Sequence, residues 1–168
     1  TMLGGLSWDR MRTYNTCAGT RYVRTNRIKP VDTWNLDAAP SPYEDLDAFM
    51  TRAGELAEDL LDNGISSMKI WPFDPAGIEN KGQFITTAQM KEAIKPFELI
   101  RAAVGDKMDI MVEMHSLWNL PTAMEIARTL EQFNPGWYED PIRMNSPQAL
   151  AEFARSTHVW TCASETLG

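Results

Sequence analysis

Apolar residues along the chain follow two alternating patterns, a helical spacing of three to four residues and short, nearly continuous runs. Helical spacing predicts amphipathic helices, and short apolar runs bounded by turn residues predict buried strands. The helical spacing predicts helices at 41–61, at 86–104, at 119–133 and from 146 onward. The short runs predict strands at 11–16, 65–73, 109–114, 137–138 and 159–163, with a long loop at 18–40. Asp74, Pro75, Gly77 and Gly82 predict a further loop before the helix that begins near Thr86.

Capping signals mark two of the predicted helix starts. Ser41, Pro42 and Glu44 predict an N-cap, a first helical residue and a capping-box partner. Thr86 and Gln89 have the same spacing as Ser41 and Glu44, and they predict a second capping box. Strands and helices therefore alternate along the chain. This alternation predicts an α/β protein with a parallel sheet covered by helices.

Two α/β architectures have this order of elements: an open doubly wound sheet and a (β/α) barrel. A glycine-rich phosphate loop after the first strand would favour the doubly wound sheet, and the sequence has no such loop there. Polar residues instead follow the ends of the strands, where barrel enzymes assemble their active sites. These residues are Asn15, Lys69, Glu113 with His115, Glu139 and Glu165. We therefore predict a parallel (β/α) barrel of the TIM type.

The length of the chain limits how much of a barrel it can form. A complete barrel needs about 250 residues, whereas the chain has 168. We therefore expect only about the first five of the eight strands, in a piece of a larger enzyme. Residues 1–10 are interpreted as a linker from a missing N-terminal domain, and 11–168 as the partial barrel.

Composition and charge exclude several kinds of partner. The net charge of −7 and the pI near 4.8 argue against nucleic acid or an anionic membrane, because either partner favours a basic surface. The sequence shows no apolar run that could span a bilayer and no signal-peptide pattern. The two cysteines, Cys17 and Cys162, lack metal-ligand spacing and are expected to be reduced. A cytoplasmic protein is therefore the expectation.

Three glutamates at predicted strand ends carry the strongest chemical signal. Glu113, Glu139 and Glu165 are separated by 26 residues each. Neighbouring parallel strands lie about 4.8 Å apart, and two charges 4 Å apart repel by about 4 kcal/mol at an effective dielectric constant of 20. Three converging carboxylates must therefore share protons or hold a cation, and oxygen ligands suit Mg²⁺. The alternative is that each glutamate merely begins a loop or caps a helix, which equal spacing on consecutive strands disfavours.

Four short motifs lie at the ends of the predicted strands: Met68-Lys69-Ile70-Trp71, Val112-Glu113-Met114-His115, Tyr138-Glu139-Asp140-Pro141 and Ser164-Glu165-Thr166-Leu167. Together they resemble the barrel half of the enolase superfamily, in its mandelate racemase/muconate-lactonizing branch. The resemblance covers most of the chain from about Leu3. It implies that the three glutamates are Mg²⁺ ligands that hold a substrate carboxylate while its α-proton is removed, with the metal stabilising the ene-diolate. It also implies that the missing N-terminal domain is a capping domain that shapes specificity.

The sequence departs from the family pattern at two positions. Members of the family often have Lys-x-Lys on the second strand, with the second lysine as a base. Here Lys69 matches the first lysine, an electrostatic partner of the substrate carboxylate, and Trp71 stands at the base position as a candidate pocket residue. His115 stands where many members have asparagine. The sugar-acid dehydratases of the branch, such as galactonate and mannonate dehydratases, often have this histidine as the acid that protonates the departing hydroxyl.

We therefore predict a Mg²⁺-dependent lyase that dehydrates an aldonate- or aldarate-type sugar acid to a 2-keto-3-deoxy acid. His115 and Lys69 are the candidate catalytic residues, and the enzyme is expected to be a homo-oligomer. The base is expected on later barrel strands outside the chain, because the other histidine, His158, stands at the wrong end of its strand. Two alternatives stay open: a racemase or epimerase of the same superfamily, which Trp71 disfavours, and a non-catalytic fragment or small-acid binding module.

Overall fold

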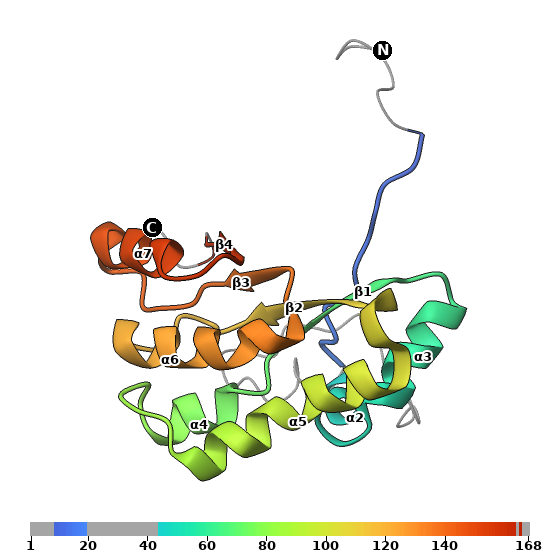
Figure 1. Ribbon diagram of the computed structural model, residues 1–168, viewed down its shortest axis with the longest axis horizontal. Coiled ribbons are helices and arrows are strands. Elements are labelled where there is room, and N and C mark those ends of the chain that lie inside the picture. The colour runs from blue at the N-terminus through green and yellow to red at the C-terminus, as the bar shows by residue number, and fades with distance from the viewer. Residues whose placement is uncertain (1–8, 20–43, 164, 166–168) are drawn as a thin grey trace, which may run out of the picture.

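A computed structural model of the chain describes residues 9–19, 44–163 and 165. Its helices are α2 (Asp45–Thr51), α3 (Ala53–Asp62), α4 (Asp74–Glu79), α5 (Thr87–Val104), α6 (Leu120–Leu130) and α7 (Pro147–Arg155). Short 3-10 turns follow α5 at Gly105–Lys107 and α6 at Glu131–Phe133. The strands are β1 (Ser67–Ile70), β2 (Asp109–Glu113), β3 (Trp137–Glu139) and β4 (Trp160–Cys162). Figure 1 shows these strands as one sheet with α5 and α6 on the same side of it.

The four strands form a parallel sheet in the order β1-β2-β3-β4, so each strand lies beside its neighbour in sequence. The predicted parallel α/β arrangement is confirmed, and the strand order of the described sheet contains no reversal. The first of the five predicted strands was placed at 11–16. In the structure only Asn15 bridges to β1, by accepting from Lys69 N–H at 2.8 Å and donating to Ser67 O at 2.9 Å. Met11 is 89% exposed, so this segment lacks the buried side chains that would hold a full strand.

The two faces of the sheet differ in what covers them. Alternate residues point to opposite faces of a strand, and Tyr138 marks the covered face, since its hydroxyl donates to Ala127 O in α6 at 2.9 Å. Its ring also packs edge-on against Phe153 of α7. On the opposite face, Met111 and Trp137 line a hollow of about 400 Å³. Lys69, Glu113 and Glu139 share this second face with Met111 and Trp137, because residues that are register partners, or two apart on one strand, point the same way.

Several local predictions are confirmed and others are wrong. Thr86 and Gln89 form the predicted capping box at the start of α5, which continues through Pro96. Asn119 and Ser146 cap α6 and α7 through their side chains. The single helix predicted at 41–61 is instead divided at Arg52, whose φ of −149° and ψ of 46° are not helical.

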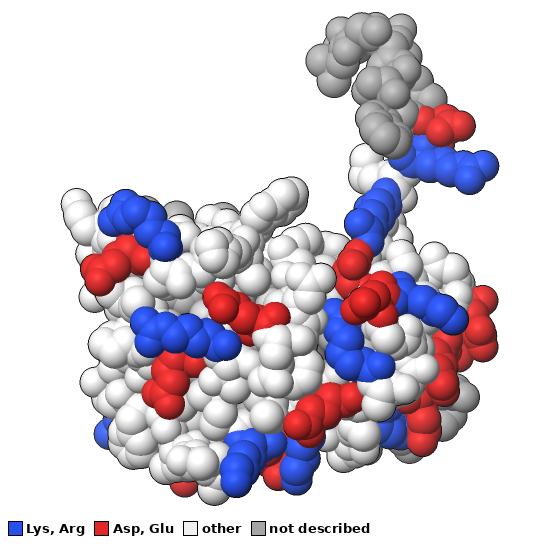
Figure 2. All heavy atoms as spheres, in the orientation of Figure 1, with Lys and Arg blue, Asp and Glu red and all other residues white. Residues whose placement is uncertain are grey.

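The beginning of that predicted helix lies partly outside the described residues, which include neither Ser41 nor Pro42; the described part of α2 follows Glu44. The segment 74–79 was predicted to be a loop but forms α4. Asp74 and Pro75 are the reason, because an acidic residue and proline favour the first turn of a helix. None of the described helices is long and apolar enough to cross a membrane. Figure 2 shows acidic and basic side chains interspersed over the visible face.

Candidate active site

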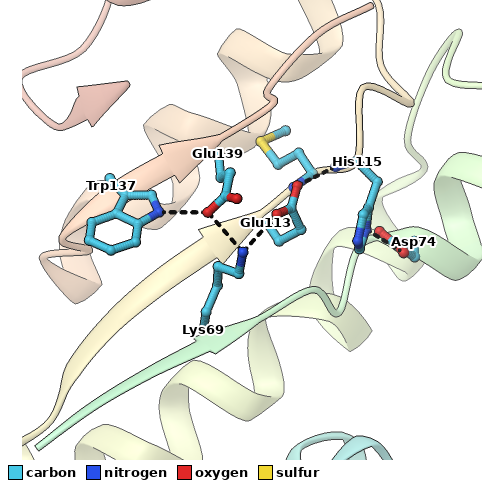
Figure 3. Close-up of polar contacts among 7 residues, drawn as sticks. Lys69, Asp74, Glu113, His115, Trp137 and Glu139 are labelled. Carbon is cyan, nitrogen blue, oxygen red and sulfur yellow. Dashed lines mark hydrogen bonds and ion pairs between the residues drawn. The ribbon is translucent and has the colours of Figure 1, made fainter. Parts of the chain in front are cut away.

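Three charged side chains meet at the carboxyl ends of neighbouring strands, on the face of the sheet that the helices leave open. Lys69 comes from β1, Glu113 from β2 and Glu139 from β3 (Figure 3). Glu113 and Glu139 are direct register partners, so parallel pairing brings their carboxylates to the same level of the sheet. Lys69 lies one strand away, and its long side chain reaches both carboxylates. The carboxyl edge of a parallel sheet is where barrel enzymes place their catalytic groups.

The Lys69 ammonium lies between the two carboxylates. Its Nζ is 3.1 Å from Glu113 Oε2 and 2.8 Å from Glu139 Oε2 (Figure 3). Lys69 is 8% exposed and Glu113 only 2%. Buried charges of this kind are stable only when they are paired and hydrogen-bonded. The group of three thus carries one net negative charge when all its members are ionised.

Further donors complete the hydrogen bonding of the two carboxylates. Glu113 Oε1 accepts from the backbone N–H of Met114 at 3.1 Å and of His115 at 2.9 Å. Glu139 Oε2 also accepts from the indole N–H of Trp137 at 3.1 Å. Trp137 stands two residues before Glu139 on β3, so both side chains point to the same face. The indole donor fixes the orientation of the Glu139 carboxylate.

Burial and charge shift the acidities of the three groups in different directions. Burial raises the pKa of Glu113 above its ordinary value, although the His115 N–H and Lys69 oppose it. Burial would also raise the pKa of Glu139, but the contact with Lys69 outweighs it and lowers that pKa. Burial alone would lower the pKa of Lys69, yet Glu139 and Glu113 raise it. The lysine is therefore firmly a cation in this setting.

His115 follows directly after this group, in the loop between β2 and α6. Its Nδ1 lies 2.8 Å from Asp74 Oδ2, at the beginning of α4 (Figure 3). The ring of Trp71 lies edge-on to the imidazole, with the ring centroids 5.6 Å apart. Burial alone would lower the pKa of His115, but Asp74, with help from Glu113 and Glu165, raises it. The neighbouring carboxylates thus favour the protonated form of the imidazole.

The backbone in these loops takes unusual conformations. His115, Ser116 and Asp140 all have positive φ angles, of 48°, 55° and 42°. Non-glycine residues rarely adopt this region, and such residues cluster at functional sites. Ser116 N–H donates to Asp140 O at 2.8 Å, which joins the loops that follow β2 and β3. The strained turns therefore lie where the predicted catalytic residues are found.

Glu165 is placed differently from the other two glutamates. It is exposed and follows the end of β4, and the register partner of Glu139 on β4 is Cys162. Within the described parts of the chain, no group of three or more His, Cys, Asp or Glu side chains is arranged to hold a metal ion. Glu113 and Glu139 do form a pair of hard oxygen donors of the kind that Mg²⁺ prefers. The donor chemistry fits the ion, and the metal-ligand roles of all three glutamates stay predictions.

Two site residues were not predicted from the sequence. Asp74 was assigned to a loop, and its position directly after the predicted strand at 65–73 was the signal that could have identified it. Trp137 was treated only as a strand residue, although its i, i+2 relation to Glu139 indicates a shared face. Trp71 is 5% exposed and packs against Phe49 as well as His115, and its role in substrate binding stays a prediction.

A cluster of ionised side chains at the carboxyl edge of a parallel sheet is typical of α/β enzymes. A family model described as enolase C-terminal domain-like matches residues 52–168. The chain therefore belongs to the enolase C-terminal domain-like family, as its motifs suggested.

Proteins with known names and structures support this assignment. D-galactonate dehydratase of Ralstonia nicotianae is 26% identical over 166 residues, which cover 99% of this chain and 35% of that protein. D-gluconate dehydratase of Thermoproteus tenax is 27% identical over 113 residues, which cover 67% of this chain and 22% of that protein. A crystal structure of an enolase of the mandelate racemase subgroup from Agrobacterium tumefaciens is 42% identical, with a TM-score of 0.75, over 99% of this chain and 37% of that one. The chain thus spans well under half the length of these relatives.

Proposed function

We propose that the chain is part of a Mg²⁺-dependent lyase that dehydrates an aldonate- or aldarate-type sugar acid to a 2-keto-3-deoxy acid. The observation that carries the proposal is Lys69 held between Glu113 and Glu139 at the carboxyl edge of the sheet, in a family whose similar members are named sugar-acid dehydratases. In the whole protein we infer a closed (β/α) barrel. The sequential strand order of the described sheet supports it, because a doubly wound sheet would reverse its order at a switch point.

The metal would be held by Glu113 and Glu139, joined by Glu165. When bound, Mg²⁺ would supply positive charge beside the substrate carboxylate, which lowers the cost of removing the neighbouring proton. Lys69 reaches the same edge of the sheet, and its ammonium would add a second positive charge for that carboxylate. The two carboxylates would thus bind the metal ion, and the metal ion and the ammonium would together bind the anionic substrate.

His115 would act as the acid of the reaction. A base removes the α-proton of the sugar acid, the electrons of that C–H bond form a C=C bond, and the β C–O bond breaks. The β-hydroxyl leaves as water by taking a proton from the imidazole. The enol that remains becomes the 2-keto-3-deoxy acid when its hydroxyl proton leaves and its β-carbon takes one up. His115 suits this role because Asp74 and the nearby glutamates favour its protonated form.

The base is proposed to lie on later strands of the barrel. Trp71 stands where the second lysine of the family pattern would be, and an indole cannot accept a proton there. This strand therefore supplies no base, which disfavours racemisation by two opposed bases. Exchange of solvent deuterium into the α-carbon of a recovered substrate, without loss of water, would instead favour the racemase alternative.

The proposal is tested by assaying the whole protein against a panel of aldonates and aldarates, with and without a chelator. Glu139→Gln removes one charged oxygen ligand and is expected to lower turnover by at least about 100-fold, because even outer-shell changes at metal sites cost about 10–100-fold. Glu98→Gln on the exposed face of α5 is the matched control and should keep full activity. Equal turnover by the Glu139 variant and the unmodified protein would refute the proposal.

A further inference from the structure

The His115 imidazole contacts a carboxylate from a different βα unit. Asp74 begins α4, four residues after the end of β1, whereas His115 lies two residues after the end of β2. His115 Nδ1 and Asp74 Oδ2 are 2.8 Å apart, and both side chains are largely buried, at 23% and 17% exposed (Figure 3). A contact between a largely buried carboxylate and an imidazole nitrogen constrains the ring more than a solvent-exposed contact would.

We propose that Asp74 is a positioning residue that holds His115 at Nδ1, so that the imidazole delivers its proton to the substrate from Nε2. This inference rests on the proposed function of His115 as the acid. In a neutral histidine, the hydrogen bond made by one ring nitrogen decides which nitrogen carries the proton. An acceptor at Nδ1 selects the tautomer protonated there and fixes the direction in which Nε2 points.

The position of Asp74 relative to His115 is itself fixed by packing. Gly77 in α4 lies against the loop after β2, and a Cβ atom there would be 3.1 Å from Leu117 Cδ1. Gly82 approaches the same loop still more closely, because a Cβ there would be 1.8 Å from Leu117 O. Asn119 N–H donates to Gly82 O at 2.9 Å. The segment that carries Asp74 and the loop that carries His115 are therefore joined at several points as one unit.

Two more contacts hold the histidine from other sides. Its backbone N–H donates to Glu113 Oε1 at 2.9 Å, which ties the positive φ of His115 to the carboxylate pair. The Trp71 ring lies edge-on to the imidazole with an interplanar angle of 78°. Neither of these two contacts involves Nδ1, which is the ring atom that lies 2.8 Å from Asp74 Oδ2. Replacing Asp74 should therefore change the tautomer and rotation of the ring without removing the imidazole.

The test compares Asp74→Ala and Asp74→Asn in the whole protein, with Asp62→Asn at the exposed end of α3 as the control. Asp74→Ala should lower kcat by about 10–100-fold, the effect that losing the partner of a metal-ligating histidine typically has. KM should change by less than about threefold, because the proton is delivered only in the transition state. Asp74→Asn keeps an oxygen that can accept from Nδ1–H, so it should recover a large part of kcat.

Nitrogen-15 NMR of the histidine rings supplies a measurement that does not depend on turnover. The difference between spectra of the unmodified protein and of His115→Gln assigns the ring signals. The neutral ring should carry its proton on Nδ1 in the unmodified protein and in Asp74→Asn, and shift toward the Nε2 tautomer in Asp74→Ala. An unchanged tautomer in Asp74→Ala, or a loss of kcat that Asp74→Asn does not reduce, would overturn the inference.

Failure of the inference and failure of the proposed function can be told apart. If the unmodified protein dehydrates no sugar acid, the dehydratase proposal fails, and the tautomer comparison still decides whether Asp74 positions the ring. If the protein is an active dehydratase and Asp74→Ala has normal kcat, the inference fails and the function stands. Near-ultraviolet circular dichroism of each variant shows whether the fold is kept, and the nearly isosteric Asp74→Asn covers the case in which the alanine variant does not fold.

Discussion

Replacing Lys69 with methionine should lower the free energy of unfolding more than removing one partner of an ordinary surface ion pair would. Lys69 Nζ contacts Glu113 Oε2 at 3.1 Å and Glu139 Oε2 at 2.8 Å, so these two oxygens are at most 5.9 Å apart. Two unit charges about 6 Å apart repel by about 3 kcal/mol at an effective dielectric constant of 20. Removing one partner of a buried ion pair typically costs about 3–5 kcal/mol. The two estimates agree on a loss of about 3 kcal/mol or more.

The measurement is urea unfolding of Lys69→Met and of the unmodified protein, both without divalent ions. The free energy of unfolding should fall by about 3 kcal/mol with an unchanged m-value, which would mean that the unfolded state is unaffected. Lys95→Met is the matched control, because Lys95 pairs with Glu92 on the exposed face of α5. Surface pairs contribute about 0–1 kcal/mol. A Lys69 variant that loses no more than the Lys95 variant would refute the electrostatic reasoning.

Three other substitutions test the fold away from the charged group. Arg101→Met should lower the free energy of unfolding in urea by about 2–4 kcal/mol. The Arg101 guanidinium donates to several backbone carbonyls of the loops before β2 and β3, and each charged hydrogen bond contributes about 1.5–3 kcal/mol, although the contributions do not add fully. A loss below about 1 kcal/mol would contradict this. Tyr138→Phe should lower the free energy of unfolding by only about 1 kcal/mol, because the Ala127 carbonyl that accepts from the Tyr138 hydroxyl also accepts from a helix-capping backbone N–H. A loss above about 3 kcal/mol would contradict this. Gly82→Ala should cost at least about 2 kcal/mol, since a φ of 67° is strained for alanine and its Cβ would overlap Leu117 O; an unchanged thermal midpoint would count against it.

The order of the elements could be predicted because local signals and long-range pairing agree. Thr86 and Gln89 predict a capping box from spacing alone, and the structure forms it from the same atoms. Glu113 and Glu139 could be predicted to meet, because adjacent parallel strands align their carboxyl ends. Both inferences depend only on neighbours in sequence or on neighbouring strands. The parallel α/β class follows from the same information.

Features that depend on tertiary packing could not be predicted. The break at Arg52 divides a continuous apolar pattern, and nothing in the local residues marks it. Equal spacing in sequence also does not give equal register: Glu113 pairs with Glu139, but Glu139 pairs with Cys162 rather than with Glu165. Register depends on where each strand begins after its helix and loop, and the lengths of these connections differ. A period of 26 residues therefore places the glutamates on consecutive strands but does not determine their level along the strand direction.

The contact between His115 and Asp74 shows why the sequence identified one member of the pair and not the other. His115 stands two residues after Glu113, so its chemistry was visible in a short motif. Asp74 lies 41 residues earlier, in a segment whose proline and glycine indicated a loop. The pair forms only because α4 folds back against the loop after β2, where Gly77 and Gly82 allow close approach. The proposed acid can thus be identified from its own strand, whereas the residue proposed to orient it is brought to it by the packing of two βα units.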